Sequence, residues 1–431
     1  MAVRAGTRQR ARAHGLTALL LACLWCVPAW AGEFTISGDG SGYSNRDLAN
    51  DPTLVCAACV PAPPPENDTP LFDLDWSLGL RGSVTEGDGT TRYEVLALPS
   101  LSLKQQTVRG GYDLSVGGEL SKTADGEARI DALDAEVGGT YELDSVTTLA
   151  GRGTLSISQD DPRSGTDYAS NVASAPIVVT GTGEASVTRD LGLFDVELRS
   201  KAARTGYGNT VYDDASTTDN SFQNTTSYGV GGRVGVKVTP GLTAFVDGDA
   251  TADQYDAASP SLGVKLDGTT YEARAGLNFK LRETLELEGS AGLAYRDFKD
   301  AGVEDFTAAI YGAKVVFVPD ETVSLTGELT TTVSAPGTTA SASGKVEYAA
   351  TGSAAVQVNP WLRLRAKAGW SYSETIGADS TEQTASAGAG ADYLLSAMTD
   401  LTADYTYTRS LTGTGTETDE HVVALGVTFH R

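Results

Sequence analysis

The chain has 431 residues, a formal net charge of −24, 49 glycines and only 3 histidines. This acidity argues against nucleic acid as a partner, because binding to phosphate needs clustered Lys and Arg side chains. Hydrophobic residues make up 40% of the chain and aromatic residues 7%, which is low for a packed soluble protein of this length.

The first 31 residues have the pattern of a secretory signal peptide. Four arginines between Arg4 and Arg12 precede an apolar stretch from Leu16 to Val27, and Ala29-Trp30-Ala31 supplies the cleavage site. A lipoprotein signal with Cys23 as the modified residue is the weaker alternative, because the residues after it are still apolar. No later run of about 18 apolar residues exists, so the sequence predicts an exported chain without a transmembrane helix.

Residues 32–70 form a polar extension that ends in a proline-rich linker at residues 61–65. This extension holds the two cysteines of the mature chain, Cys56 and Cys59, for which we expect a local disulfide in an oxidising compartment. A c-type haem site would need His after the second cysteine, where Val60 stands, and zinc would need two more ligands. We therefore expect no metal and no cofactor.

From residue 71 onward the chain alternates apolar and polar residues with the period of a β-strand. In residues 362–372, Leu, Ala, Trp and Tyr occupy one face while Arg, Lys, Gly and Ser occupy the other. Residues 271–281, 285–296 and 323–330 repeat this pattern, and helical periodicity is absent. The sequence predicts an all-β chain built from long strands.

Two kinds of connector separate these segments. Tight connectors recur at residues 239–241, 282–284, 319–321, 359–360 and 398–400, and longer polar loops lie at 208–225, 255–269, 335–343 and 411–419. Short turns that alternate with longer loops predict a meander of hairpins. We count eighteen strands between residues 72 and 429, with sixteen as the alternative because residues 104–150 contain few turn signals.

Three features favour a membrane barrel over a soluble β-sandwich or propeller. The strands are longer than the 5–6 residues typical of soluble sheets. The face opposite the apolar one is polar or charged at nearly every position, as a water-filled lumen allows. Aromatic residues cluster at both ends of the apolar face, as in the two interfacial girdles of membrane barrels: Tyr271, Tyr295, Phe306, Tyr372, Tyr405 and Tyr407 toward the long loops, and Phe279, Phe317, Trp361, Tyr393 and Phe429 toward the short turns.

Strands that face lipid cannot leave backbone groups unpaired, so the sheet must close on itself. The sequence therefore predicts a closed antiparallel transmembrane β-barrel over residues 71–431, placed in the cell outer membrane among lipid and lipopolysaccharide. An even strand count puts both termini on the side of the short turns, which is the periplasm, and the longer loops face outward.

The repeated turns Val238–Leu242 and Val358–Leu362 and the terminal strand Val422–Phe429 resemble the outer-membrane β-barrel porins of Gram-negative bacteria. The resemblance covers residues 226–431 well and 72–225 loosely. It implies passive diffusion or another outer-membrane role, with a homo-oligomer as one possibility. It also implies that the terminal strand is read by the barrel-assembly machinery; a Phe usually ends such chains, whereas here His430 and Arg431 follow.

The polar face carries the candidate lumen residues, whose charges could tune ion selectivity if rows of opposite sign face one another. The alternative is that they only keep the lumen hydrated. The basic ladder Arg363, Arg365 and Lys367 is the sharpest candidate, and we expect Glu347 and Asp392 to neutralise it. The other lumen-lining candidates are Glu286, Glu288, Glu272, Arg274, Glu328, Arg233 and Lys237.

These observations favour a diffusion porin for small hydrophilic solutes or ions. The alternative is a structural or partner-holding barrel, with residues 32–70 as a plug. A Cys-x-x-Cys motif ahead of a barrel also resembles the sheath barrels of outer-membrane electron conduits, on the strength of that motif alone. An enzyme is disfavoured, because a lone His421 beside Asp419 and Glu420 is no catalytic constellation.

Overall fold

A computed structural model describes residues 72–431 except residues 88–89, 125–127, 161, 163–170, 335–343, 378–379 and 414. The predicted signal peptide (1–31) and the extension (32–70) with Cys56 and Cys59 lie outside the described residues. Among the described residues, no helix is long and apolar enough to cross a membrane.

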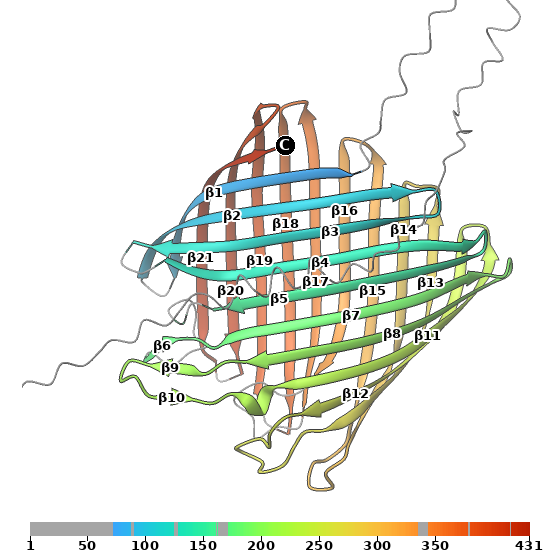
Figure 1. Cartoon of the computed structure of the whole chain (residues 1–431), viewed down its shortest axis with the longest axis horizontal. Coiled ribbons are helices and arrows are strands. Elements are labelled where there is room, and N and C mark those ends of the chain that lie inside the picture. Colours follow the sequence, from blue (N-terminus) through green and yellow to red (C-terminus); the bar gives the residue numbers. More distant parts are fainter. Residues whose placement is uncertain are drawn as a thin grey trace, which may run out of the picture. The chain divides into compact units, whose positions relative to one another are not determined.

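Eighteen long antiparallel strands form one sheet, whose walls appear in front and behind in Figure 1. They are β1 (Asp73–Gly87), β2 (Thr90–Thr107), β3 (Gly110–Thr123), β4 (Ala128–Asp144), β5 (Thr147–Gln159), β7 (Ile177–Asp190), β8 (Phe194–Tyr207), β11 (Thr225–Thr239), β12 (Leu242–Tyr255), β13 (Gly268–Leu281), β14 (Leu285–Phe298), β15 (Phe306–Asp320), β16 (Val323–Ser334), β17 (Gly344–Asn359), β18 (Leu362–Ile376), β19 (Ser380–Ser396), β20 (Thr399–Thr412) and β21 (Glu417–His430).

The sheet closes because the last strand pairs with the first. The register between β1 and β21 runs from Ser77 opposite His430 to Gly87 opposite Glu420. The last residue extends this closing seam, since the Arg431 N–H donates to the Trp76 carbonyl at 3.1 Å. His430 and Arg431, which follow the usual terminal Phe, are therefore part of the barrel wall.

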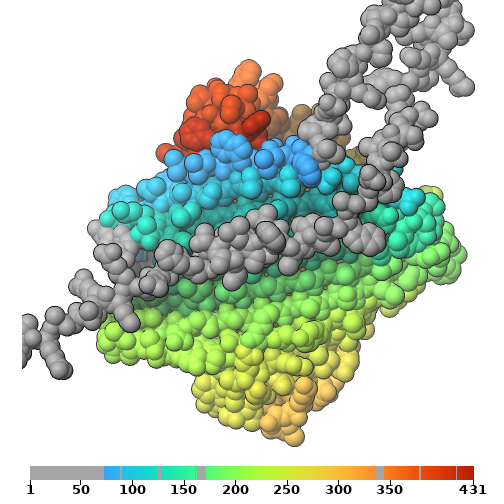
Figure 2. Space-filling model, viewed as in Figure 1, coloured from blue at the N-terminus to red at the C-terminus, as the bar shows by residue number. Residues whose placement is uncertain are grey.

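Eighteen strands are confirmed, and the alternative of sixteen is wrong. The stretch with few turn signals, residues 104–150, holds two hairpin turns of two residues each, at 108–109 and 145–146. Neither turn contains Gly or Pro, which explains why the sequence marks them poorly. In Figure 1 the strands β1, β2, β3, β4, β5, β7 and β8 follow one another in chain order over the near wall, and the colours of Figure 2 run in the same order from blue to green.

One end of the barrel, here named the turn end, carries only short connections between strands, and the other, here named the loop end, carries the longer connections together with the short joins between β1 and β2 and between β18 and β19. The five tight connectors predicted from the sequence fall at the turn end. The loop end carries the short elements β6 (Val172–Ser174), β9 (Thr210–Tyr212), β10 (Thr217–Thr218) and the 3₁₀ helix η1 (Ser221–Gln223). The first three form a small separate sheet.

The two faces of the wall can be told apart by ion pairs that skip strands. Arg233 on β11 reaches Glu288 on β14 at 3.1 Å, although β12 and β13 lie between their strands. Neighbouring strands are about 4.8 Å apart, so such a contact forms only across the concave side of a curved sheet. The charged residues that share this face therefore point into the barrel, and the alternate apolar residues point outward.

The outward face is apolar and exposed, as a lipid-facing surface is. Val230, Leu293 and Leu425 are at least 60% exposed there. Tyr271 lies opposite Tyr295 toward the loop end, while Trp361 and Phe429 lie toward the turn end. These positions agree with the predicted aromatic girdles.

Phe306 is an exception to the predicted girdle. It lies opposite Arg296 on the inward face of β15 and packs against Phe298, with ring centroids 6.3 Å apart. Loop residues turn inward onto this part of the wall and build a small apolar core, the loop core, made of Tyr255, Leu266, Phe298 and Val303 with Leu262, Val264 and Phe306 around it. The prediction for Phe306 was wrong because strand periodicity says nothing about loops that fold back inside.

Candidate functional site: a charged belt on the inner wall

A belt of charged side chains runs around the inner wall, here named the charged belt. Acids and bases often stand directly opposite each other on adjacent strands, as Arg152 does with Glu184, and Glu184 with Lys201. The belt comprises Glu136 (β4), Arg152 (β5), Glu184 (β7), Arg199 and Lys201 (β8), Arg233 (β11), Asp247 and Asp249 (β12), Glu272 and Arg274 (β13), Glu288 (β14), Lys314 (β15), Glu328 (β16), Arg363, Arg365 and Lys367 (β18), Asp392 (β19), Asp404 (β20) and Arg81 (β1).

Asp247 is the most densely paired member of the belt. Its Oδ2 atom accepts hydrogen bonds from Arg199 Nη2 and from Arg233 Nε, both at 3.0 Å. Asp249 takes a second bond from Arg199 at 2.9 Å. The Asp247 side chain is only 3% exposed, so it is a buried carboxylate neutralised by two guanidinium groups.

Arg233 connects this group to the next strands. Its guanidinium lies 4.0 Å from the centre of the inward Phe245 ring and pairs with Glu288. Glu288 also accepts from Asn278 Nδ2 at 3.0 Å. A cation over an aromatic face and a shared carboxylate hold the guanidinium in one position.

The other sequence candidates on this wall fall into local pairs. Arg274 pairs with Glu272 on the same strand, and Glu286 accepts from Lys280 at 3.4 Å. Lys237 lies near the turn end, away from the belt, where it pairs with Asp190 at 2.8 Å and Asp195 at 3.0 Å. Glu328 stands opposite Lys314 in the register.

The basic ladder on β18 is neutralised only at its centre. Arg365 Nη2 lies 2.7 Å from Asp392 and 3.0 Å from Asp404. Within the described residues, no ion pair is formed by Arg363 or Lys367. Of the two expected acidic neighbours Asp392 is present, but Glu347 lies nearer the loop end and pairs with Lys345 at 3.4 Å instead.

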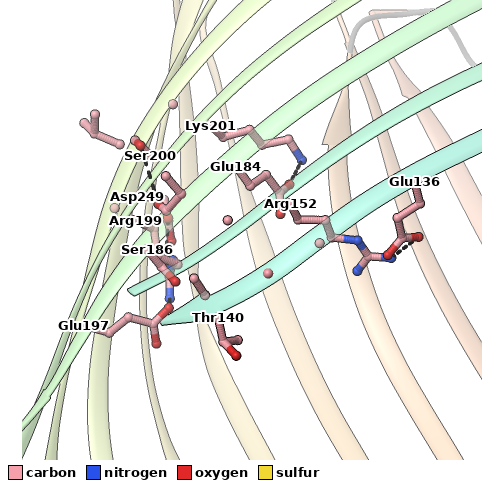
Figure 3. A pocket seen from close by; sticks show the side chains of 18 of the residues that line it. Glu136, Thr140, Arg152, Glu184, Ser186, Glu197, Arg199, Ser200, Lys201 and Asp249 are labelled. Atoms are coloured by element: carbon pink, nitrogen blue, oxygen red, sulfur yellow. Dashed lines mark hydrogen bonds and ion pairs between the residues drawn. The ribbon is translucent and has the colours of Figure 1, made fainter. Parts of the chain in front are cut away.

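A cavity of about 630 Å³ hollows the inner wall between β3 and β12. Its floor includes the inward-facing Gly138, Gly229 and Gly231, whose missing side chains leave room. Figure 3 shows the ion pairs of Arg152 with Glu136 and of Lys201 with Glu184 along it, at 2.8 and 3.0 Å. Arg152 and Lys201 are 58% and 54% exposed, so solvent reaches them from inside the barrel.

The comparisons with known proteins agree with this architecture. Residues 85–431 match the family described as "Putative beta-barrel porin 2". The chain belongs to this family of outer-membrane β-barrel porins. No match is found among curated proteins.

Three of the solved structures that are similar to this chain come from two bacteria. OccK3 (OpdO) of Pseudomonas aeruginosa is 13% identical, with 83% of this chain and 96% of that chain covered and a TM-score of 0.41. OpdK of Pseudomonas aeruginosa, solved with vanillate, is 11% identical, covered to 83% and 99%, with a TM-score of 0.45. The FrpB iron transporter of Neisseria meningitidis is 9% identical, covered to 79% and 63%, with a TM-score of 0.44.

The porin's belt includes residues that the sequence reasoning did not single out. Glu136 on β4 lies within the stretch where turns were hard to place, whereas Arg152 on β5 and Glu184 on β7 lie beyond it. Glu136 alternates with the apolar Ala135 and Val137, but Arg152 stands between two glycines and Glu184 between Gly183 and Ala185, so the period-2 pattern is weak there. The face of a strand also cannot be assigned before its ends are known. In the structure acids and bases alternate around the belt instead of separating into two facing rows.

At the loop end of the porin, acidic residues are held in local contacts. The Asp256 carboxylate accepts from Arg204 Nη1 at 2.9 Å, and this hydrogen bond holds the pKa of Asp256 below its ordinary value.

His421 lies on the outward face, where its Nδ1 is 2.9 Å from the Tyr405 hydroxyl. Glu420, its neighbour in the chain, points to the opposite face, so the two side chains do not converge.

Proposed function

We propose that small hydrophilic solutes and ions diffuse passively through this barrel, past the charged belt. The observation that carries the proposal is the exposure of belt side chains on the concave face. Arg152, Lys201 and Glu184 are 58%, 54% and 47% exposed although they point into the barrel. A wall with that many accessible charges is hydrated, which is what a polar solute needs in order to cross the membrane.

The belt supports weak charge selectivity. Its acids and bases alternate, so a solute of either sign meets an opposite charge within a few ångströms at most points of the wall. The excess acidity of the chain, −24 overall, therefore lies mainly outside the belt. The loop end contributes to it through Asp213, Asp214 and Asp219. We expect a slight preference for cations that is set at the loop end.

Planar-bilayer recording of the full mature chain tests the proposal. Stepwise ionic currents from folded protein are the expected result. A variant that lacks residues 32–70 serves as the second sample. Silence from the full chain combined with currents from the shortened chain would favour the plugged barrel, and silence from both would overturn the diffusion channel.

A further inference from the structure

The wall of the barrel is incomplete between β15 and β16. Pairing of these strands begins at the turn end with Asp320 opposite Val323 and stops at Ala313 opposite Leu329. Residues 306–312 and 330–334, all of them described, are not paired with each other. Both strands stay fully paired on their other sides, to β14 as far as Phe306 and to β17 as far as Ser334.

Side-chain hydroxyls occupy the place of the missing backbone ladder. The Tyr311 N–H donates to Thr331 Oγ1 at 2.9 Å, and the Thr331 hydroxyl donates to the Tyr311 carbonyl at 3.0 Å. If the ladder continued, the backbone of Thr331 would make these bonds. The Tyr348 hydroxyl reaches past β16 from β17 and donates to the Ala309 carbonyl at 3.1 Å.

An interrupted backbone ladder is unfavourable in lipid, because each backbone N–H or C=O group left without a hydrogen bond there costs several kcal/mol of free energy. The three hydroxyl contacts satisfy part of that need with bonds that side-chain rotation can break. A barrel wall that had only to be tight would continue the ladder. We therefore look for a functional role for the split.

The two unpaired stretches are themselves uncharged, and the charges opposite them on the adjacent strands are paired: Lys345 with Glu347 at 3.4 Å on β17, and the buried Arg296 on β14 with Asp253 at 2.8 Å. Residues 306–312 read FTAAIYG and residues 330–334 read TTTVS, without a single charged side chain. On the inner side Ile310 is fully buried and Phe306 packs against the loop core. On the outer side the rings of Tyr311, Tyr348 and Tyr372 follow one another at 6.3 and 6.5 Å.

We propose that the split between β15 and β16 is a lateral portal, through which uncharged, largely apolar small molecules pass between the barrel interior and the outer leaflet of the membrane. The split lies in the half of the wall next to the loop end, which faces outward in outer-membrane barrels. The apolar inward residues of β15, Phe306 and Ile310, and the hydroxyls of Thr331 and Tyr348 match a molecule with an apolar body and few polar groups. The portal rests on the outer-membrane location, but it does not require axial ion flow.

Closing the split with a disulfide tests the portal. In a Cys56→Ser/Cys59→Ser background, Tyr311→Cys with Thr331→Cys places two thiols opposite each other in the register, where an oxidised bridge draws the strands together. The control pair Ala313→Cys with Leu329→Cys bridges strands that are already paired. The probe is N-phenyl-1-naphthylamine, an uncharged aromatic amine that fluoresces on reaching lipid, added to cells that produce each variant.

For the 311/331 pair alone, we expect oxidation to lower the uptake rate of the probe to the rate seen in cells without the porin. A reducing agent should restore the uptake. Single-channel currents should stay the same, which separates the portal from the diffusion channel. Equal uptake by oxidised and reduced 311/331 protein would overturn the portal. If that pair fails to fold, Thr331→Val removes the bridging hydroxyl and should raise uptake, whereas Thr330→Val should not; equal uptake by these two variants would overturn it as well.

Discussion

At the scale of single residues, the belt depends most on Asp247. Two guanidinium groups share this carboxylate, and its 3% exposure denies it water as a substitute partner. The neighbouring Asp249 is 30% exposed and has water available. Asp247 therefore differs from Asp249 in its burial more than in its number of contacts, and we expect the buried residue to matter more for stability.

Asp247→Asn should destabilise the barrel by about 3 kcal/mol, because it leaves Arg199 and Arg233 without their shared counter-charge in a partly dry site. Glu184→Gln is the matched control, since its pair with Lys201 is half exposed and should cost less than about 1 kcal/mol. Urea unfolding in lipid vesicles measures both values. Equal losses of unfolding free energy in the two variants would contradict the conclusion that the buried Asp247 contributes more to stability than the exposed Glu184.

Arg363 and Lys367 form no ion pair within the described residues, so they should act on ion selectivity more than on stability. Arg363→Ser combined with Lys367→Ser should shift the reversal potential in a KCl gradient toward potassium. Glu328→Gln, which removes an exposed acid from the same belt, should shift it toward chloride. Unchanged potentials in both variants would show that the belt only hydrates the lumen.

At the scale of strands, the alternation of faces decides what each substitution does. On β20, Ala403 points to lipid and its neighbour Thr402 points into the barrel. Ala403→Arg should cost about 2–4 kcal/mol, as expected for a cation near the centre of the lipid-facing surface. Thr402→Arg should cost much less, because water inside the barrel solvates the guanidinium. Similar unfolding free energies for the two variants would contradict the assignment of faces.

The strand pattern could be predicted from the sequence because period-2 alternation is a local property. The segments around Leu285 and Leu362 show it within ten residues, and the turns with Pro or Gly mark their ends. The turns at 108–109 and 145–146 lack those residues, which is why the strand number stayed open until the register was known.

Contacts that cross strands could not be predicted in the same way. Arg233 and Glu288 are 55 positions apart, and only the curvature of the closed wall brings them together. The split at Tyr311 and the inward position of Phe306 also depend on how neighbouring strands and loops pack. No local pattern encodes these features, because they belong to the assembled barrel.

At the scale of the whole molecule, the low apolar content has a physical reason. Apart from the small loop core, the described strands do not pack around an apolar interior: one face of each strand meets lipid and the other meets the charged interior. Along β18 the belt residue Arg365 lies between Leu362, which stands opposite the outward Tyr393 near the turn end, and the outward Tyr372 near the loop end, so the charges stand at the level of the membrane. An open, hydrated interior at that level is the central claim.

Cysteine modification during single-channel recording tests this claim most directly. In the Cys56→Ser/Cys59→Ser background, Thr406→Cys places a thiol on the inward face of β20, and Tyr405→Cys places one on the outward face. A charged, water-soluble methanethiosulfonate reagent should lower the current stepwise in the Thr406→Cys channel and leave the Tyr405→Cys channel unchanged. A current that stays unchanged with the reagent in both variants, or that falls only in the Tyr405→Cys channel, would contradict a conduction path along the charged face.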